Sequence, residues 1–319
     1  MSSPLISIAM TTYNGEKYLK KQLDSLCNQT YPNIEVVVCD DRSKDNTESI
    51  LKSYQKRLKL QYFVNEQNLG VVKNFEKALS LCHGAYIALC DQDDIWLPNK
   101  IETLVRNIGT YSLIFSDAAL IDINDKIIEP SFRKFQKLVI WTERPLLPLF
   151  FGNFVTGCTA MLTKELVDKA LPIPGGERFH DWWLATVATK LHGIKALDNK
   201  LVLYRQHGTN DIGAIVAYNL YDRIKGLIKN PLNTIRSIQL YEKNYSKVQV
   251  KRIKSIIKNP LFSSRERIVL KEVFLYHIDV FQTKIHLKRF KLAYKYRNIL
   301  FCNRKGISFY LAIFIRLIV

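Results

Sequence analysis

The sequence lacks the segments that would carry a chain into or across a membrane. Its longest apolar run, residues 307–319, falls short of the roughly 20 residues that span a bilayer, and Arg316 interrupts it. No basic segment precedes an apolar N-terminal stretch, because the first charged side chain is Glu16. A cleavable secretion signal is therefore not expected. These absences predict a cytoplasmic protein.

Closely spaced cysteines are also absent. The six cysteines include no CxxC pair, and most of them lie in apolar runs. This usage is typical of small buried side chains in a reducing compartment. The sequence has no internal repeat and no low-complexity tract. At 319 residues it is long enough for one sizeable core with an appended unit, or for two modest domains.

Excess charge is missing from the first two thirds of the chain and concentrated in the last third. Residues 1–220 contain 25 Lys and Arg against 24 Asp and Glu, whereas residues 221–319 contain 22 against 5. The basic residues of the last third are interleaved with Tyr, Phe, Ile and Leu. Such asymmetry predicts an anionic partner for this region, either a membrane surface or a nucleic acid.

The first 120 residues alternate short apolar runs with amphipathic segments. Strands that are apolar on both faces, separated by such helices, are typical of an α/β fold with a parallel sheet covered on both sides. Further strands and one more helix follow, after a polar segment, residues 122–144, that we expect to form a mobile loop over the site. The strands are predicted at residues 6–10, 34–39, 60–64, 85–90, 111–115, 158–162 and 194–204.

The pattern changes after Asn210, where strands disappear and basic helical segments begin. We therefore predict two parts, a domain over residues 1–212 that holds the sheet and a basic helical region over residues 213–319. An amphipathic basic helix with aromatic anchors suits an anionic membrane surface. The alternative is a solvated charged face with a terminal helix packed on the core.

Three predicted strands end in unusual polar clusters. The strands run into Thr11–Gly15, Asp40–Ser43 and Asp91–Asp94. Because ligands of parallel sheets bind beyond the carboxyl ends of the strands, these clusters are expected to converge on one crevice. Carboxylates brought together in this way favour a hard divalent cation, Mg²⁺ or Mn²⁺. The alternative for the third cluster is a turn in which an aspartate merely caps the next helix.

Taken together and in this order, the motifs resemble those of the family 2 glycosyltransferases with the GT-A fold. The motifs are Thr-Thr-Tyr-Asn, Asp-Asp-Arg-Ser-Lys-Asp, Asn-Leu-Gly, Asp-Gln-Asp-Asp-Ile-Trp, His-Asp-Trp-Trp and Tyr-Arg-Gln-His. The resemblance covers residues 5–210. The exact form of the later motifs resembles rhamnosyltransferases of surface polysaccharide synthesis. One departure is Arg42, where Gly is more usual in the family.

The resemblance implies which residues hold the nucleotide. Thr11, Tyr13 and Asp41 would bind the base, with the Tyr13 ring stacked on it and the Asp41 carboxylate accepting from its ring N–H. Asn68 and Gly70 match the family's Asn-x-Gly, and Gly70 would begin a helix whose N-terminus faces the nucleotide. Taken alone, Tyr13 is equally consistent with a turn residue, and the Asn-x-Gly motif with an ordinary helix entry.

The resemblance also implies a metal and a diphosphate site. Asp93 would be the direct ligand of Mg²⁺ or Mn²⁺, which bridges the two phosphates of the donor. His207 would be a second ligand or a phosphate contact. Asp91 would hydrogen-bond the ribose or the sugar, and Arg205 would pair with the diphosphate.

Asp181 is the candidate general base, because members of this type invert the anomeric centre in a single displacement that deprotonates the acceptor. Trp182 and Trp183 would stack on the acceptor sugar; the alternative places both in the core, with Asp181 capping the helix. Asp117, after the strand at residues 111–115, could support the metal site. Cys158 and Thr159 could line the acceptor pocket.

The resemblance thus implies an inverting, metal-dependent transferase. Its donor would be a UDP- or dTDP-type sugar, with rhamnose as the candidate sugar. Its acceptor would be a lipid-linked saccharide in capsule, O-antigen or cell-wall synthesis. We expect it at the inner face of the cell membrane and expect no nucleic-acid partner. Three alternatives stay open: a membrane- or nucleic-acid-binding protein without catalysis, a nucleotidyltransferase, and a non-catalytic relative.

Overall fold

The computed structural model describes residues 3–207, 231–278 and 287–300. The predicted boundary at residue 212 and the apolar segment 307–319 lie outside these residues. The chain divides into two compact units, which are described separately. The first comprises Met1–Leu146, Asn153–Ile173 and Phe179–Ile215, and the second comprises Leu147–Gly152, Pro174–Arg178 and Val216–Val319.

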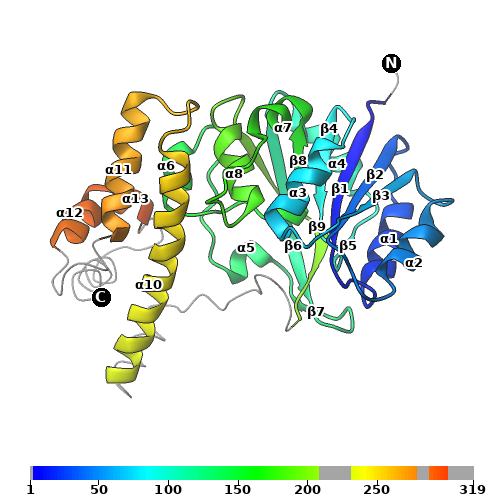
Figure 1. Ribbon diagram of the computed structural model, residues 1–319, viewed down its shortest axis with the longest axis horizontal. Helices are drawn as coiled ribbons and strands as arrows, with labels where there is room; N and C mark the ends of the chain where they lie inside the picture. The colour runs from blue at the N-terminus through cyan, green and yellow to red at the C-terminus, as the bar shows by residue number, and fades with distance from the viewer. Residues whose placement is uncertain (1–2, 208–230, 279–286, 301–319) are drawn as a thin grey trace. The chain divides into compact units, whose positions relative to one another are not determined.

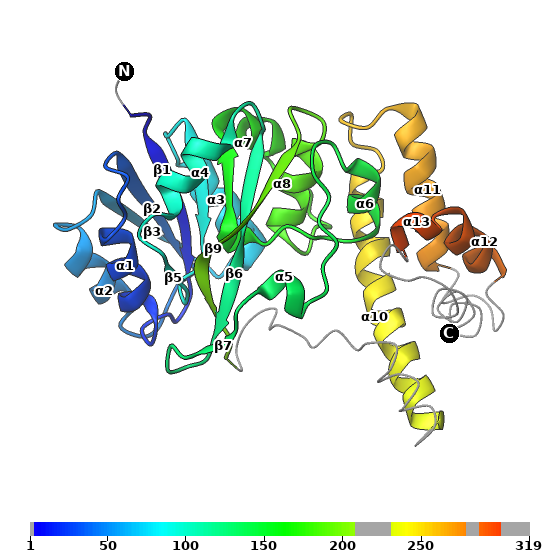
Figure 2. The ribbon, with the colours of Figure 1, turned by 180° about the vertical axis from the view of Figure 1, so that it is seen from behind.

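The first unit contains a 9-stranded mixed sheet with helices on both faces (Figures 1 and 2). The strand order is β3-β2-β1-β4-β8-β6-β9-β5, with β7 paired to β6. β1 lies parallel to β2 and β4, β2 to β3, and β6 to β9. The strands are β1 (Ile6–Thr12), β2 (Ile34–Asp40), β3 (Leu60–Val64), β4 (Tyr86–Cys90), β5 (Ile95–Trp96), β6 (Leu113–Ile121), β7 (Ile127–Glu129), β8 (Ala160–Thr163) and β9 (Ile194–Arg205).

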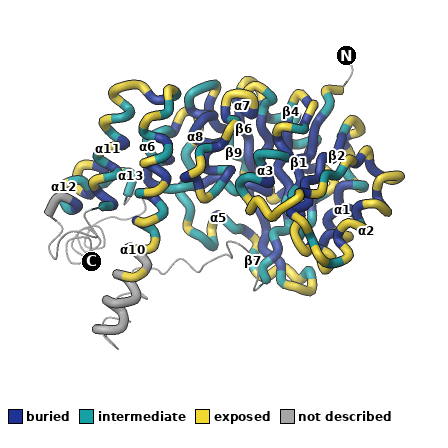
Figure 3. Tube along the Cα trace, in the orientation of Figure 1, coloured by how far each residue is buried: buried dark blue, intermediate teal, exposed yellow. Residues whose placement is uncertain are grey.

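The apolar side chains of the sheet explain why both faces are covered. Alternate residues of β1, Ile6, Ile8 and Met10, share one buried cluster with Leu23 of α1 and Ile101 of α4, while α3 packs on the opposite face of β1 and β2, beside α7 and α8. Each fully buried side chain of this size contributes roughly 1.5–3 kcal/mol. Figure 3 shows the sheet as the buried centre of this unit. The helices of the unit are α1 (Leu19–Cys27), α2 (Thr47–Tyr54), α3 (Val71–Ser80), α4 (Lys100–Ile108), α5 (Phe132–Phe135), α7 (Lys164–Ala170) and α8 (His180–Ala188).

Among the strands predicted from the sequence, one runs against the expected parallel pattern. β8 is antiparallel to both β4 and β6. The chain enters β8 through the 3₁₀ turn η1 (Gly157–Thr159), in which Cys158 lies beside Asp91 at the carboxyl end of β4. β8 therefore starts at the edge where β1, β2 and β4 end, and η1 joins the polar clusters there.

The described part of the second unit is helical. α10 (Pro231–Ile256), α11 (Ser264–Ile278), α12 (Leu287–Lys295) and α13 (Arg297–Leu300) pack with most of α6 (Leu146–Phe151). Phe150 packs edge-on against Phe262, and Phe151 lies against Tyr276 and Tyr296. Among the described helices, none combines the length and the apolar character that crossing a bilayer requires.

Candidate active site

The loop after β1 is fixed by a glutamine of the Asp-Gln-Asp motif. The Tyr13 amide donates to Gln92 Oε1 at 2.8 Å, and Gln92 Nε2 donates to the Tyr13 carbonyl at 3.1 Å. A Cβ on Gly15 would lie 2.4 Å from Gln92 Oε1, so a side chain at this position would displace the Gln92 amide. The Tyr13 side chain stays 47% exposed at the edge of the sheet. Its ring is therefore free to stack on a ligand, and Gln92 holds the backbone of the same loop in place. Thr11, at the end of β1, is half-buried.

Asp41 organises the loop that leads into α3. Its carboxylate accepts from the amides of Leu69 at 2.7 Å and Gly70 at 2.9 Å, and from Asn65 Nδ2 at 2.9 Å. Asn68 Nδ2 donates to the Asp41 carbonyl at 3.3 Å. The three donors to the carboxylate leave about one of its four acceptor positions for a ligand.

The expectation that the α3 N-terminus is open toward the nucleotide needs correction. Gly70, with φ of +77°, precedes α3, and its amide is already bonded to the Asp41 carboxylate. The protein therefore supplies its own anion at this helix end. The Asn-x-Gly motif therefore holds Asp41 in position at the end of β2.

Arg42 occupies a backbone conformation that favours glycine. Its φ is +67°, in the left-handed region, which costs a residue with a Cβ roughly 1–2 kcal/mol. The side chain is exposed beside the Asp41 loop. Arginine in place of the glycine that is more usual in the family therefore has an energetic cost at this position.

The end of β4 gathers carboxylates whose charges oppose one another. Burial raises the pKa of Asp91 well above its usual range, and the negative charges of Asp94, Asp93 and Asp181 raise it further. Burial, with the charge of Asp93, also raises the pKa of Asp94 to about 7. Asp94 is fully buried, whereas Asp91 and Asp93 are half-buried at the crevice. The effect of the Asp181 charge on the pKa of Asp91 indicates that the candidate base lies near the acidic motif.

A buried lysine lies behind this cluster. Lys100 Nζ donates to the Cys158 carbonyl at 2.6 Å and lies 3.1 Å from the centre of the Trp96 ring. Burial lowers the pKa of Lys100 to about 7, although the charges of Asp94 and Asp91 oppose this shift. Lys100 thus connects the first turn of α4 to η1. Sequence reasoning missed it, because a lysine just inside a predicted helix carries no signal of burial.

The predicted metal ligands Asp93 and His207 are in contact. His207 Nε2 lies 2.8 Å from Asp93 Oδ2, and the imidazole stacks on Tyr18 with ring centres 5.1 Å apart. In a separate group, one potential ligand atom each from Asp91, Asp94 and Cys158 lies within 4.8 Å of the other two. Burial raises the pKa of the Cys158 thiol well above its usual range. A protonated thiol is a poor ligand for a hard cation.

This arrangement fits a divalent cation. The carboxylates at the end of β4 repel one another, and their oxygen donors match the preference of Mg²⁺ and Mn²⁺. Asp93 and His207 would hold the ion, with Asp91 beside them. Once bound, such an ion would neutralise charge on a leaving diphosphate.

The prediction that Arg205 pairs with a diphosphate is wrong in this structure. Its side chain is fully buried. Nε donates to the Asp93 carbonyl at 2.8 Å, and Nη1 donates to the Asp122 carbonyl at 3.0 Å and pairs with Asp125. The guanidinium therefore holds the backbone of the acidic motif and the β6–β7 turn. A planar group with several donors suits this task better than lysine would.

The candidate base Asp181 is held by two donors. Asn153 Nδ2 donates to Oδ1 at 3.1 Å, and the Gly157 amide donates to Oδ2 at 3.0 Å. A Cβ on Gly157 would approach Asp181 Oδ2 to 3.4 Å and His180 Nε2 to 3.2 Å. The α8 motif and η1 are therefore tightly fitted. Asn153 lies in a segment whose sequence pattern gave no indication of such a role.

The expected stacking of Trp182 and Trp183 on an acceptor also needs correction. Both side chains are only 2% exposed, and Trp183 Nε1 donates to the Ala170 carbonyl at 2.7 Å. Both indoles are part of the core around α8. The neighbouring His180 stacks on Phe75 with ring centres 3.8 Å apart, and burial lowers its pKa to about 3.

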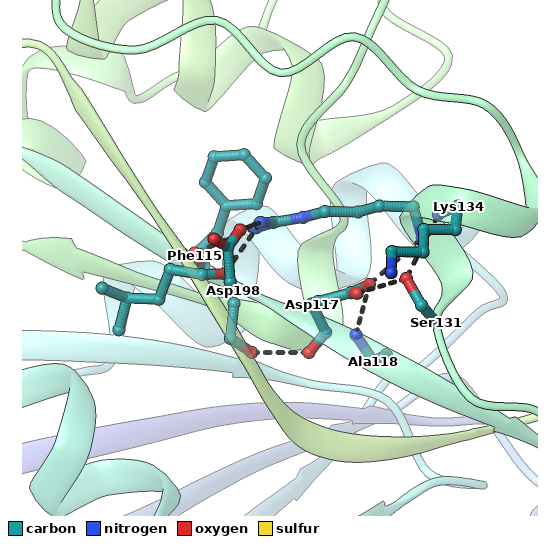
Figure 4. Close-up of polar contacts among 9 residues, drawn as sticks. Phe115, Asp117, Ala118, Ser131, Lys134 and Asp198 are labelled. Carbon is teal, nitrogen blue, oxygen red and sulfur yellow. Dashed lines mark hydrogen bonds and ion pairs between the residues drawn. The ribbon is translucent and has the colours of Figure 1, made fainter.

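Asp117 belongs to a structural cluster and does not join the candidate metal site. Its carboxylate accepts from Ser131 Oγ at 2.5 Å, the Arg133 amide at 3.1 Å and its neighbour Ala118 at 2.8 Å (Figure 4). The Arg133 guanidinium donates to the Leu197 and Phe115 carbonyls. This buried cluster ties α5 to β6 and β9. The expectation of a mobile loop over residues 122–144 is therefore wrong where α5 is anchored.

Comparison with known proteins identifies the family of this fold and site. The model of the family described as glycosyl transferase family 2 matches residues 7–171. The dTDP-rhamnosyl transferase RfbG of Shigella flexneri is 32% identical over 237 residues, 69% of this chain and 79% of RfbG. The Escherichia coli protein WfgD, a UDP-Glc:alpha-D-GlcNAc-diphosphoundecaprenol beta-1,3-glucosyltransferase, is 33% identical over 185 residues, 57% of this chain and 70% of WfgD.

A solved structure shares the fold over most of the chain. The mannosyltransferase PcManGT from Pyrobaculum calidifontis, in complex with GDP-Man and Mn²⁺, matches with a TM-score of 0.58 and 15% identity. The match covers 98% of this chain and 79% of PcManGT. The GT-A fold predicted from the sequence motifs is confirmed.

Proposed function

The chain belongs to glycosyltransferase family 2 and transfers a sugar from a nucleotide-sugar donor, and from this premise we propose that it is an inverting, metal-dependent enzyme whose general base is Asp181. The observation that carries the proposal is the position of Asp181. Its carboxylate is held by Asn153 and Gly157 and lies close enough to Asp91 to raise the pKa of that group. This nearness supports the assignment of a base and an acidic, phosphate-binding motif to one site.

The proposed chemistry is a single displacement. The acceptor hydroxyl attacks the anomeric carbon while its proton passes to the Asp181 carboxylate. The new glycosidic bond forms as the bond from that carbon to the diphosphate breaks, and the nucleoside diphosphate leaves with the electron pair. A hydroxyl has a high pKa, so positioned proton removal contributes roughly 10²–10⁴-fold to the rate.

The donor half of the site lies at the ends of β1 and β2. Tyr13 would stack on the base, Asp41 would accept from its ring N–H, and Thr11 would line the same pocket. Asn68 and Gly70 keep Asp41 in place. The exposed Tyr13 ring and the fixed loop backbone support this assignment. Asp91 would bind the ribose or the sugar.

Mg²⁺ or Mn²⁺ is the proposed cofactor, held by Asp93 and His207. Two observations support this cofactor: the Asp93 and His207 side chains are in contact, and the structure of PcManGT contains Mn²⁺. Relatedness to RfbG supports a dTDP-type donor and rhamnose, whereas WfgD uses UDP-Glc. The acceptor of WfgD is a diphosphoundecaprenol-linked sugar. We extend this acceptor class, lipid-linked saccharides of surface polysaccharide synthesis, to the present chain, which would then work at the inner face of the cell membrane.

A stabilisation screen tests the donor site. UDP, dTDP and GDP would each be added with and without Mn²⁺, and the midpoint of thermal unfolding measured. A ligand at 100 times its dissociation constant adds about 2.7 kcal/mol to the free energy of unfolding. We expect UDP or dTDP to stabilise the protein only when Mn²⁺ is present, and Asp93→Ala to remove that metal dependence. No response to any nucleotide would contradict the proposal.

A further inference from the structure

One face of α10 presents a row of lysines. Leu240 begins the row, and the lysines follow at intervals of three or four residues. With 3.6 residues per turn, these positions fall within roughly a quarter of the helix circumference. All of them are exposed, Leu240 to 62%. The lysines are Lys243, Lys247, Lys251 and Lys254 in α10 and Lys258 in the turn that follows it. We call this set the lysine ridge.

The opposite face of α10 is anchored within the second unit, which fixes the direction in which the ridge points. Gln249 Nε2 donates to the Phe151 carbonyl at 3.0 Å. Arg252 is fully buried, and its Nε donates to Glu177 Oε2 at 2.9 Å. A Cβ on Gly176 would lie 2.7 Å from the Lys251 carbonyl, so the chain approaches the helix backbone closely there. The helix cannot rotate to bury its lysines without breaking these contacts.

The ridge carries positive charge that its surroundings in the described residues do not neutralise. Residues 243–258 contain no Asp or Glu. No hydrogen bond or ion pair of a ridge lysine side chain occurs within the part of the chain that the structure describes. Like charges four residues apart destabilise a helix. A partner that neutralises them would remove this cost.

We propose that the lysine ridge docks α10 lengthwise on an anionic phospholipid surface. Lysines suit the diffuse charge of a lipid surface, and Leu240 adds an apolar side chain to the same row. A nucleic-acid surface would instead favour arginine and exposed aromatic rings. The arginine of this stretch, Arg252, is buried in an ion pair, and Tyr245 Oη is bonded to the Phe151 carbonyl. The observations therefore favour lipid.

The inference deepens the membrane location in the proposed function and assigns it to α10. It does not depend on the catalytic assignment. Lys247→Gln/Lys251→Gln in the full chain removes two ridge charges. The matched control is Lys56→Gln/Lys59→Gln, which removes two exposed lysines from the first unit and leaves the same net charge. Binding would be measured by co-sedimentation with vesicles of phosphatidylglycerol and phosphatidylcholine in equal parts, and with phosphatidylcholine alone.

Each lysine near an anionic surface contributes roughly fivefold to the partition coefficient. We expect the ridge variant to bind the anionic vesicles roughly 25-fold more weakly than the control, and neither variant to bind phosphatidylcholine alone. Equal binding by both variants would overturn the proposal, as would a larger loss of binding to a short duplex DNA than to the vesicles. Transfer to a water-soluble acceptor should be unchanged in the ridge variant, so failed catalysis and failed docking give different results.

Discussion

Asn153 and the Gly157 amide determine where the two oxygens of Asp181 point. A residue that orients the base should affect the chemical step more than donor binding. We predict that Asn153→Ala lowers kcat roughly tenfold, with donor KM little changed. Loss of a donor to the carboxylate should also raise the pKa of Asp181 and shift the acidic limb of the kcat profile to higher pH.

The matched control is Asn99→Ala, at the exposed N-cap of α4. Steady-state kinetics over a range of pH would check both parts of the prediction. A fall in kcat without a shifted acidic limb would mean that Asn153 acts only through the local fold.

Arg42 combines backbone strain with an exposed position at the donor side of the crevice. Glycine adopts its φ of +67° without a Cβ penalty. We predict that Arg42→Gly raises the free energy of unfolding by about 1 kcal/mol and weakens nucleotide binding. Urea denaturation and calorimetric titration with UDP or dTDP would measure the two effects. Unchanged stability of the Arg42→Gly variant would contradict the proposed strain. The control is Arg42→Lys, which should keep the strain.

Single residues were predicted well where several motifs converged and poorly where exposure decided their role. Asp93 and His207, 114 positions apart, do meet. Trp182, Trp183 and Arg205 were placed in contact with ligands, yet they are buried. A motif gives chemical type and order along the chain, but burial depends on packing between distant elements. Gln92 was missed for a related reason, because its partner is the backbone of a distant loop.

At the scale of elements, α8 contains a buried histidine that must stay neutral. The pKa of His180 is about 3 in the fold, against 6.5 ordinarily. Between these values the unfolded chain binds a proton that the folded chain does not. Stability should therefore be unaffected above about pH 6.5 and fall below it by up to about 1.4 kcal/mol per pH unit.

His180→Phe keeps a ring against Phe75 and removes the titration. We predict that the wild-type protein loses stability relative to this variant as the pH falls from 6.5 to 4.5. Denaturant unfolding at several pH values would measure the difference. A constant difference would contradict the buried neutral state, and His192→Gln, which changes an exposed imidazole, should leave the pH dependence as it is.

The strands with long β-branched runs lie close to their predicted positions. The apolar pattern of these runs and the amphipathic pattern of the helices between them indicate the same boundaries. β5 and β7, with two and three residues, are too short to give a pattern. The direction of β8 could not be predicted either. It depends on η1 joining the carboxyl edge, which is a long-range contact of Cys158 with the end of β4.

At the scale of the molecule, chemistry and charge are carried by different units. The first unit contains the crevice, and the second contains the lysine ridge. The uneven charge along the sequence indicated this division, because charge composition does not depend on knowing the contacts. Which lysines form a surface could not be predicted, since that depends on the buried partners of Arg252 and Gln249.

The central claim is that Asp181 removes the proton of the acceptor at a crevice that also binds a nucleotide sugar. The most direct measurement compares Asp181→Asn with the wild-type protein in donor binding and in single-turnover transfer, with Asp168→Asn on α7 as an exposed control. The account predicts a donor Kd that is nearly unchanged and a transfer rate that falls roughly 10²–10⁴-fold. Transfer at the wild-type rate in Asp181→Asn would contradict it.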